Sequence, residues 1–123
     1  MATILIVDDD QDCRTVLRWA LKSQGHEVTE ARDGEEALQR ITSEKPELVL
    51  LDVLMPKKDG IETLQVLQTS KPAIPVIAMS GGGQLRSEFL LRMMGQFGAI
   101  EYLAKPFSPA DLAAAVSRQL RPS

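Results

Sequence analysis

The stretch TILIVDDD, residues 3–10, decides the fold and raises the first chemical question. Its apolar part, residues 4–7, is typical of a strand buried on both faces, as the strands of parallel sheets are. The run then stops at Asp8, Asp9 and Asp10, whose like charges repel one another. Carboxylates held close together resist ionising unless a positive group lies among them. The stretch therefore predicts a buried strand that ends in an acidic cluster beside a positive group.

Similar apolar runs recur along the chain and predict a parallel sheet. They are separated by stretches with helical spacing, and this alternation of strand and helix is typical of α/β folds. The predicted strands are residues 3–7, 26–30 (the weakest), 47–51, 74–79 and 99–103. The predicted helices are residues 11–23, 35–42, 61–68, 85–94 and 109–120.

Length and composition limit the class of protein. With 123 residues, 44% of them apolar and 25% charged, the chain is expected to form one domain over residues 1–123. A net charge of −3 argues against direct nucleic-acid binding through phosphate neutralisation. No apolar run is long enough to cross a bilayer, and no secretory signal pattern opens the chain. Cys13 is the only cysteine, so a reducing cytoplasm is the expected compartment.

The first predicted helix carries an apolar stripe that we expect to face the core. The stripe consists of Val16, Leu17, Ala20 and Leu21, and Trp19 is also interpreted as a packing residue. Cys13 is expected to be a buried or half-buried filler. Asp10 has two interpretations that the residues leave open, a helix cap or a member of the acidic site.

Local signals also mark other helix limits. The second predicted helix should stop before Pro46, because the residue preceding a proline is pushed out of helical conformation. Ser108 before Pro109 is the expected cap of the last helix. His26 has no partner at ligand spacing and is interpreted as structural.

Polar residues stand at the C-terminal ends of four predicted strands. These residues are Asp8, Asp52, Ser80 and Lys105. In an open α/β sheet, ligands bind in the crevice outside those ends. Neighbouring strands lie about 4.8 Å apart, so adjacent first and third strands would bring Asp8, Asp9 and Asp52 into one site. Mg²⁺, a hard cation that prefers carboxylate and water oxygens, suits such a site.

Each of these residues also has an ordinary interpretation. Asp8 and Asp9 could cap a helix or be solvated, and Asp52 could end a strand at a proline turn. Ser80 could be a loop serine, and Lys105 a surface lysine. The coincidence of all four strand ends favours a functional site.

Four segments in order resemble the receiver domains of two-component response regulators. They are ILIVDDD (4–10), LVLLDVLMPKKDG (48–60), VIAMS (76–80) and GAIEYLAKPF (98–107), and the resemblance covers essentially the whole chain. It implies a single-domain, doubly wound, flavodoxin-like fold with five helices and a five-stranded parallel sheet in the order 2-1-3-4-5, the order of the family's chemotaxis member.

The resemblance also implies a role for each site residue. Asp52 would be the nucleophile that accepts a phosphoryl group, Lys105 would bind a phosphoryl oxygen, and Ser80 would donate its hydroxyl to that group. The implied Mg²⁺ ligands are Asp8, Asp9, Asp52 and the backbone oxygen of Leu54. Ser80 and Tyr102 would then shift and change the surface of the fourth helix, fifth strand and fifth helix.

The resulting expectation is a phosphoacceptor switch in a two-component or phosphorelay system, not an enzyme with external substrates. It would undergo only self-phosphorylation and self-dephosphorylation. Its expected partners are a histidine kinase or histidine phosphotransfer protein and a downstream effector, with no direct nucleic-acid or membrane binding. A homodimer is a further expectation, because residues 88–97 are more apolar than a one-sided helix requires. The alternative is a Mg²⁺-dependent phosphatase of the aspartyl-phosphate class, although that class has its nucleophile on the first strand.

Overall fold

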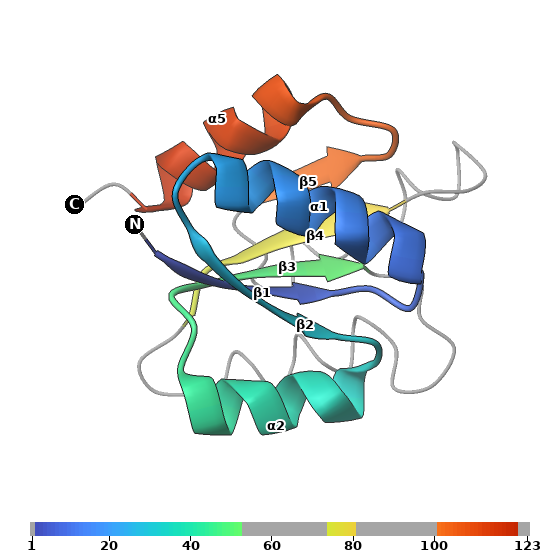
Figure 1. Cartoon of the computed structure of the whole chain (residues 1–123), viewed down its shortest axis with the longest axis vertical. Helices are drawn as coiled ribbons and strands as arrows, with labels where there is room; N and C mark the ends of the chain where they lie inside the picture. Colours follow the sequence, from blue (N-terminus) through green and yellow to red (C-terminus); the bar gives the residue numbers. More distant parts are fainter. Residues whose placement is uncertain (1, 53–73, 81–100, 121–123) are drawn as a thin grey trace.

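The computed structural model describes residues 2–52, 74–80 and 101–120, and its centre is a five-stranded parallel sheet (Figure 1). The order is β2-β1-β3-β4-β5, and every neighbouring pair is parallel. This confirms the predicted doubly wound fold and its strand order. The strands are β1 (Thr3–Val7), β2 (Glu27–Ala31), β3 (Leu48–Asp52), β4 (Val76–Ser80) and β5 (Glu101–Ala104).

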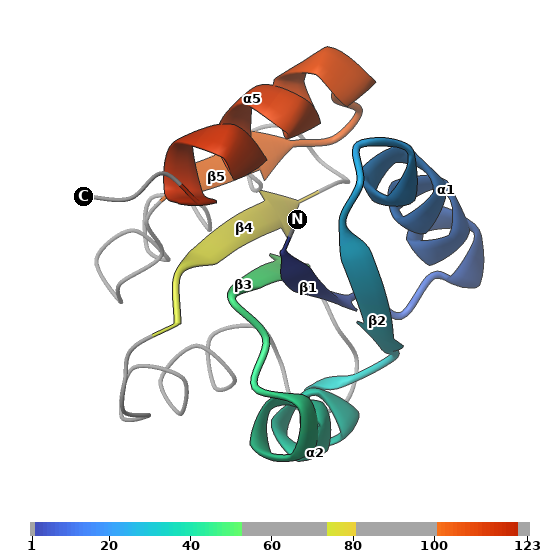
Figure 2. The ribbon, with the colours of Figure 1, turned by 60° about the vertical axis from the view of Figure 1, so that its left-hand side comes forward.

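Helices cover both faces of the sheet. Helices α1 (Gln11–Ser23) and α5 (Pro109–Leu120) pack on one face, and α2 (Gly34–Glu44) packs on the other (Figures 1 and 2). The bounds of α1 and α5 agree with the prediction, whereas α2 is longer at both ends. The helices predicted at 61–68 and 85–94, the apolar segment 88–97 and Leu54 all lie outside the described residues. None of the helices in the described ranges is long and apolar enough to span a membrane.

The core has two halves because successive residues of a strand point to opposite faces. In β1, Ile4 and Ile6 pack in the cluster under α1 and α5, whereas Leu5 and Val7 pack in the cluster under α2. All four side chains are fully buried. Burial of each such side chain stabilises the fold by roughly 1.5–3 kcal/mol. Because the buried side chains lie in both clusters, apolar packing stabilises both faces of the sheet.

The same alternation in β3 prepares the position of the site. Leu48 and Leu50 belong to the cluster under α1 and α5, and Val49 and Leu51 belong to the other. Continuing by two residues, Asp52 falls on the face that α1 and α5 cover.

Two predictions about α1 were wrong. Leu17, Ala20 and Leu21 are buried as expected, but Val16 is 65% exposed and Trp19 is 74% exposed. The reason is geometric: successive residues turn by about 100° around a helix. The buried face of α1 is narrow and centred near Leu17 and Leu21, so Val16 falls at its edge and Trp19 on the opposite side.

Capping side chains fix the helix ends. The Asp10 carboxylate accepts a hydrogen bond from the Asp12 amide at 3.0 Å, so Asp10 is the N-cap of α1. Ser108 Oγ accepts from the Asp111 amide at 3.0 Å at the start of α5, as predicted. Helix α2 ends before Pro46, also as predicted, and its C-cap Lys45 is left-handed with φ of 49°.

His26 has a structural contact, as its sequence context indicated. Its ring Nδ1 accepts a hydrogen bond from the Ala2 amide at 3.3 Å. This contact joins the residues that precede β1 and β2, at the opposite edge of the sheet from the acidic residues.

Candidate functional site

The acidic residues converge where β1 and β3 end. These strands are neighbours, with Val7 opposite Leu51 in the parallel register. Asp8 and Asp9 follow β1, and Asp52 is the last residue of β3. One carboxylate oxygen from each of the three aspartates lies within 4.8 Å of the others. The structure therefore brings together the three aspartates as the sequence predicted.

Burial differs among the three carboxylates. Asp8 is fully buried, Asp52 is 6% exposed, and Asp9 is exposed at the mouth of the site. A buried carboxylate is costly unless hydrogen bonds and opposite charge compensate it. The site must therefore supply positive charge to its inner pair.

Lys105 supplies that charge. Its Nζ donates a hydrogen bond to Asp8 Oδ2 at 2.7 Å and lies 3.6 Å from Asp52 Oδ2. Lys105 follows directly after β5, the outermost strand, so this contact joins that strand to the ends of β1 and β3. The ammonium group of Lys105 thus neutralises part of the negative charge of the acidic cluster.

The pKa values of this pair shift in the directions that favour the charged forms. Burial acts to raise the pKa of Asp8, but the hydrogen bonds from Lys105 and the Asp10 amide outweigh it, and the pKa lies below its usual value. Burial likewise acts to lower the pKa of Lys105, but the hydrogen bond to Asp8 and the negative charge of Asp52 raise it well above its usual value. Both groups are charged at neutral pH.

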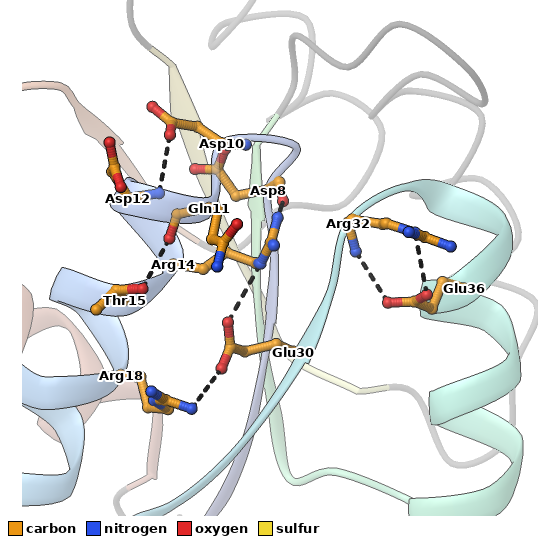
Figure 3. Close-up of polar contacts among 10 residues, drawn as sticks. All are labelled: Asp8, Asp10, Gln11, Asp12, Arg14, Thr15, Arg18, Glu30, Arg32 and Glu36. Atoms are coloured by element: carbon orange, nitrogen blue, oxygen red, sulfur yellow. Dashed lines mark hydrogen bonds and ion pairs between the residues drawn. The ribbon is translucent and has the colours of Figure 1, made fainter.

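Backbone contacts hold Asp8 in place. Its amide donates to the Ala31 carbonyl at 3.1 Å, and its Oδ1 accepts from the Asp10 amide at 2.9 Å. Its carbonyl accepts from Arg14 Nη1 at 2.6 Å, a contact between α1 and the end of β1 (Figure 3). Sequence reasoning missed Arg14, because its partner is a main-chain carbonyl, which leaves no signal in the identity of any residue.

Arg14 is in turn held by a carboxylate on β2. Its Nε donates to Glu30 Oε1 at 3.2 Å, and Arg18 Nη1 lies 3.1 Å from the other oxygen of Glu30 (Figure 3). The Arg14 side chain is only 14% exposed, whereas that of Arg18 is 45% exposed. The two arginines thus share one carboxylate, but only Arg14 reaches the acidic site.

A cleft of about 570 Å³ lies beside the acidic cluster, between the start of α1 and the segment after β5. Val16 lines it, which accounts for the exposure of this apolar side chain. Cys13, half-buried as predicted, also lines it. Burial, followed by the hydrogen bond with Asp8, raises the pKa of the Cys13 thiol to about 11, so the thiol is protonated at neutral pH.

The donor set suits the metal expected from the sequence. Three carboxylates within 4.8 Å offer hard oxygen ligands, and Asp9 provides one of them at the solvent-exposed side. Mg²⁺ prefers such ligands and keeps several waters, which an exposed mouth allows. Asp8, Asp9 and Asp52 therefore fit the ion, and the expected ligand Leu54 lies outside the described residues.

The remaining site residues are placed by the backbone. Ser80 ends β4, the strand next to β3, and pairs in register with Ala104. Tyr102 lies on β5 opposite Ala78, three positions before Lys105. Ser80 and Lys105 thus belong to the same edge of the sheet as the acidic cluster.

Comparison with known proteins shows which proteins the chain is similar to. The family model described as the response regulator receiver domain matches residues 4–117. The alkaline phosphatase synthesis transcriptional regulatory protein PhoP of Bacillus subtilis is 40% identical over 121 residues, covering 98% of this chain and 49% of that protein. The transcriptional regulatory protein CpxR of Escherichia coli K12 is 42% identical over 124 residues, covering 100% of this chain and 51% of that protein.

A solved structure shows the same fold over nearly the full length of both chains. The receiver domain of NtrX from Brucella abortus superposes with a TM-score of 0.89 at 32% identity, covering 98% of this chain and 99% of that one. The chain spans about half the length of the curated relatives PhoP and CpxR. These likenesses do not favour the aspartyl-phosphate phosphatase alternative.

Proposed function

Because this chain belongs to the response regulator receiver domain family, we propose that it is a switch in which Asp52 accepts a phosphoryl group from a phosphohistidine. The chain is homologous to the phosphoacceptor domains of two-component systems. The observation that carries the assignment to Asp52 is the gathering of three carboxylates within 4.8 Å at a strand edge that also holds Lys105.

The proposed transfer needs positioning and charge more than covalent machinery. An Asp52 carboxylate oxygen attacks the phosphorus, the new O–P bond forms, and the N–P bond to the donor imidazole breaks. The imidazole nitrogen keeps the bonding electron pair and is protonated. Lys105 Nζ, 3.6 Å from Asp52 Oδ2, supports this step by offering positive charge to the phosphoryl oxygens.

Asp8, Asp9 and Asp52 would hold Mg²⁺ in this proposal, with the Leu54 backbone oxygen as a further ligand by family resemblance. When bound, the ion supplies positive charge to the phosphoryl oxygens. Asp8 is kept charged and fixed by Lys105 and the Asp10 amide, so it is ready to act as a ligand. Asp9 is exposed and can reach an ion entering from solvent.

The proposed switch follows from the new charge at Asp52. Ser80, at the end of the neighbouring strand, would donate its hydroxyl to the phosphoryl group. Tyr102, on β5, would move with it and change the surface of β5 and α5 and, as the family resemblance implies, of the helix predicted at 85–94. Replacing Tyr102 by alanine should keep phosphorylation and lose discrimination by the downstream partner.

The cycle closes by hydrolysis, without turnover of an external substrate. Water attacks the phosphorus, the O–P bond to Asp52 breaks, and inorganic phosphate leaves. We propose a histidine kinase or histidine phosphotransfer protein as the donor, an effector protein or domain as the receiver of the signal, and the cytoplasm as the compartment. Self-association through residues 88–97 is part of the same proposal.

The test is labelling by a small acyl phosphate. Incubation of the chain with acetyl phosphate and Mg²⁺, followed by intact mass measurement, should show one phosphoryl group per molecule. The Asp52→Asn variant should show none, and Asp12→Asn, which removes an exposed acid of α1, should be labelled like the wild type. Full labelling of Asp52→Asn would refute the assignment. Rapid hydrolysis of unrelated phosphomonoesters would instead support the phosphatase.

A further inference from the structure

The main chain between Asp8 and Asp9 is held from outside the acidic cluster. The carbonyl of Asp8 and the amide of Asp9 belong to one planar peptide group, so fixing the carbonyl direction fixes the peptide plane. Arg14 Nη1 donates to that carbonyl at 2.6 Å. The peptide plane in turn determines how the Asp9 side chain leaves the backbone.

We infer that Arg14 is a positioning residue for the Mg²⁺ site, acting through the peptide that joins Asp8 and Asp9. The inference rests on the proposed function, since it concerns the same ion. Every polar group of Asp8 has a partner. Its amide donates to Ala31, and its carboxylate accepts from the Asp10 amide and Lys105. Its carbonyl accepts from Arg14. The exposed Asp9 depends on this anchored neighbour for its place beside Asp52.

Arginine suits this role because its guanidinium donates in two directions at fixed geometry. Nη1 serves the Asp8 carbonyl while Nε serves Glu30 Oε1 at 3.2 Å (Figure 3). Glu30 lies on β2, in register with Ile6 of β1. The anchor therefore belongs to the sheet itself, and α1 carries the link between β2 and the end of β1.

Positioning and simple charge predict opposite effects when Arg14 is replaced. Removal of a positive charge near a cation site should by itself strengthen Mg²⁺ binding. Removal of a group that orients the ligands should weaken it, typically by a factor of ten or more in metal affinity. The direction of the change therefore separates the two explanations.

The experiment measures Mg²⁺ affinity of the unphosphorylated full chain by isothermal titration calorimetry. Arg14→Met keeps most of the side-chain stem, and its dissociation constant should rise by about tenfold. The matched control is Arg18→Met, which removes a positive charge from the same Glu30, whereas Arg18 forms no hydrogen bond or ion pair with Asp8. Its dissociation constant should stay within about twofold of the wild type or fall slightly.

Amide hydrogen exchange measured by NMR without Mg²⁺ gives a second readout. Exchange of the Asp10 amide, which donates to Asp8 Oδ1, should accelerate in Arg14→Met and stay unchanged in Arg18→Met. A role in fold stability alone would lower the unfolding midpoint without changing either measurement under conditions where the chain is folded.

The outcomes that overturn the inference are definite. An unchanged or lower dissociation constant in folded Arg14→Met would do so. If that variant does not fold, Arg14→Lys replaces it: one ammonium cannot serve the carbonyl and Glu30 in the fork geometry, so affinity should still fall, and a wild-type value overturns the inference. If the wild type does not bind Mg²⁺, the inference and the proposed metal site are both overturned. If the wild type binds Mg²⁺ and is labelled at Asp52, but the Arg14 variants bind Mg²⁺ equally well, only the inference is overturned.

Discussion

Lys105 is the charged group on which the buried Asp8 depends when no metal is bound. Replacement of Lys105 by methionine leaves a fully buried carboxylate without its 2.7 Å partner and close to Asp52. We expect the free energy of unfolding without Mg²⁺ to fall by about 1–3 kcal/mol, as for loss of a buried charged partner. Urea unfolding in the presence of a chelator measures this loss.

Mg²⁺ should restore more stability to the Lys105→Met variant than to the wild type. The ion and the ammonium both compensate the same carboxylates, so the ion matters more when the ammonium is gone. Lys22→Met, which removes an exposed lysine near the end of α1, is the control and should respond like the wild type. Equal stability of the two lysine variants without Mg²⁺ would contradict the counter-charge role.

The environment of His26 predicts how the stability of the chain changes with pH. Burial, followed by the positive charge of the amino terminus, lowers its pKa below the usual 6.5. The folded state therefore favours neutral His26, whose Nδ1 can accept from the Ala2 amide. Its contribution to stability is present above pH 6.5 and is lost as pH falls through the lower pKa of the folded state.

The measurement is thermal unfolding of the wild type and His26→Asn between pH 7 and pH 5. Asparagine can place an acceptor near the position of Nδ1 and does not titrate in this range. The midpoint of the wild type should therefore fall relative to the variant as the pH is lowered. Parallel pH profiles of the two proteins would contradict this role of His26.

At the scale of single residues, the sequence predicted the positions of some side chains and failed for others. Asp8 and Asp52 were predictable because each ends an apolar run, and ends of parallel strands share one edge of the sheet. Arg14 was not, because a main-chain acceptor has no sequence signature. Val16 and Trp19 were misplaced because an apolar stripe read from spacing does not give the width of the buried face.

At the scale of elements, residues at the start of α1 contribute both to the helix cap and to the acidic cluster. Asp10 caps α1 through the Asp12 amide, and its own amide donates to Asp8 Oδ1. The side chain of Asp10 is therefore used by the helix, while its backbone is used by the acidic cluster. The run of three aspartates thus contains one helix cap, Asp10, and two members of the acidic cluster, Asp8 and Asp9.

The division predicts different effects of two substitutions at position 10. Asp10→Asn keeps a side-chain oxygen that can accept the Asp12 amide, so stability and Mg²⁺ affinity should stay near the wild type. Asp10→Ala removes the cap and should lower the free energy of unfolding by about 1 kcal/mol. Urea unfolding and calorimetric titration check the pair. A large loss of Mg²⁺ affinity in Asp10→Asn would show that its charge belongs to the site.

Strand order and helix positions were predictable at this scale because they follow from periodicity. Apolar runs of strand length alternating with helical spacing leave few α/β arrangements, and the receiver resemblance supplied the order. Boundaries were less predictable: β4 begins at Val76, two residues later than expected. Its first predicted residues, Ile74 and Pro75, are apolar but make no strand pairing, although Pro75 still accepts a hydrogen bond from the Val49 amide.

At the scale of the whole molecule, the site joins the middle of the sheet to its edge. Asp8 follows the interior strand β1, Asp52 ends the interior strand β3, and Lys105 follows the outermost strand β5. Anything that binds these residues only in the folded state must stabilise the complete fold, because they converge only when the sheet has formed.

Mg²⁺ should therefore raise the thermal unfolding midpoint of the chain in a concentration-dependent way. At an ion concentration of 100 times the dissociation constant the added stability is about 2.7 kcal/mol, and a chelator should remove it. Asp9→Asn should lose most of this rise because it removes one of the three carboxylates proposed to hold the ion. Asp12→Asn, which removes a carboxylate outside that cluster, should keep the rise. NaCl at matched ionic strength controls for screening. An equal rise in Asp9→Asn and Asp12→Asn would mean that the ion acts on the general negative charge of the surface instead of on the site at the strand ends.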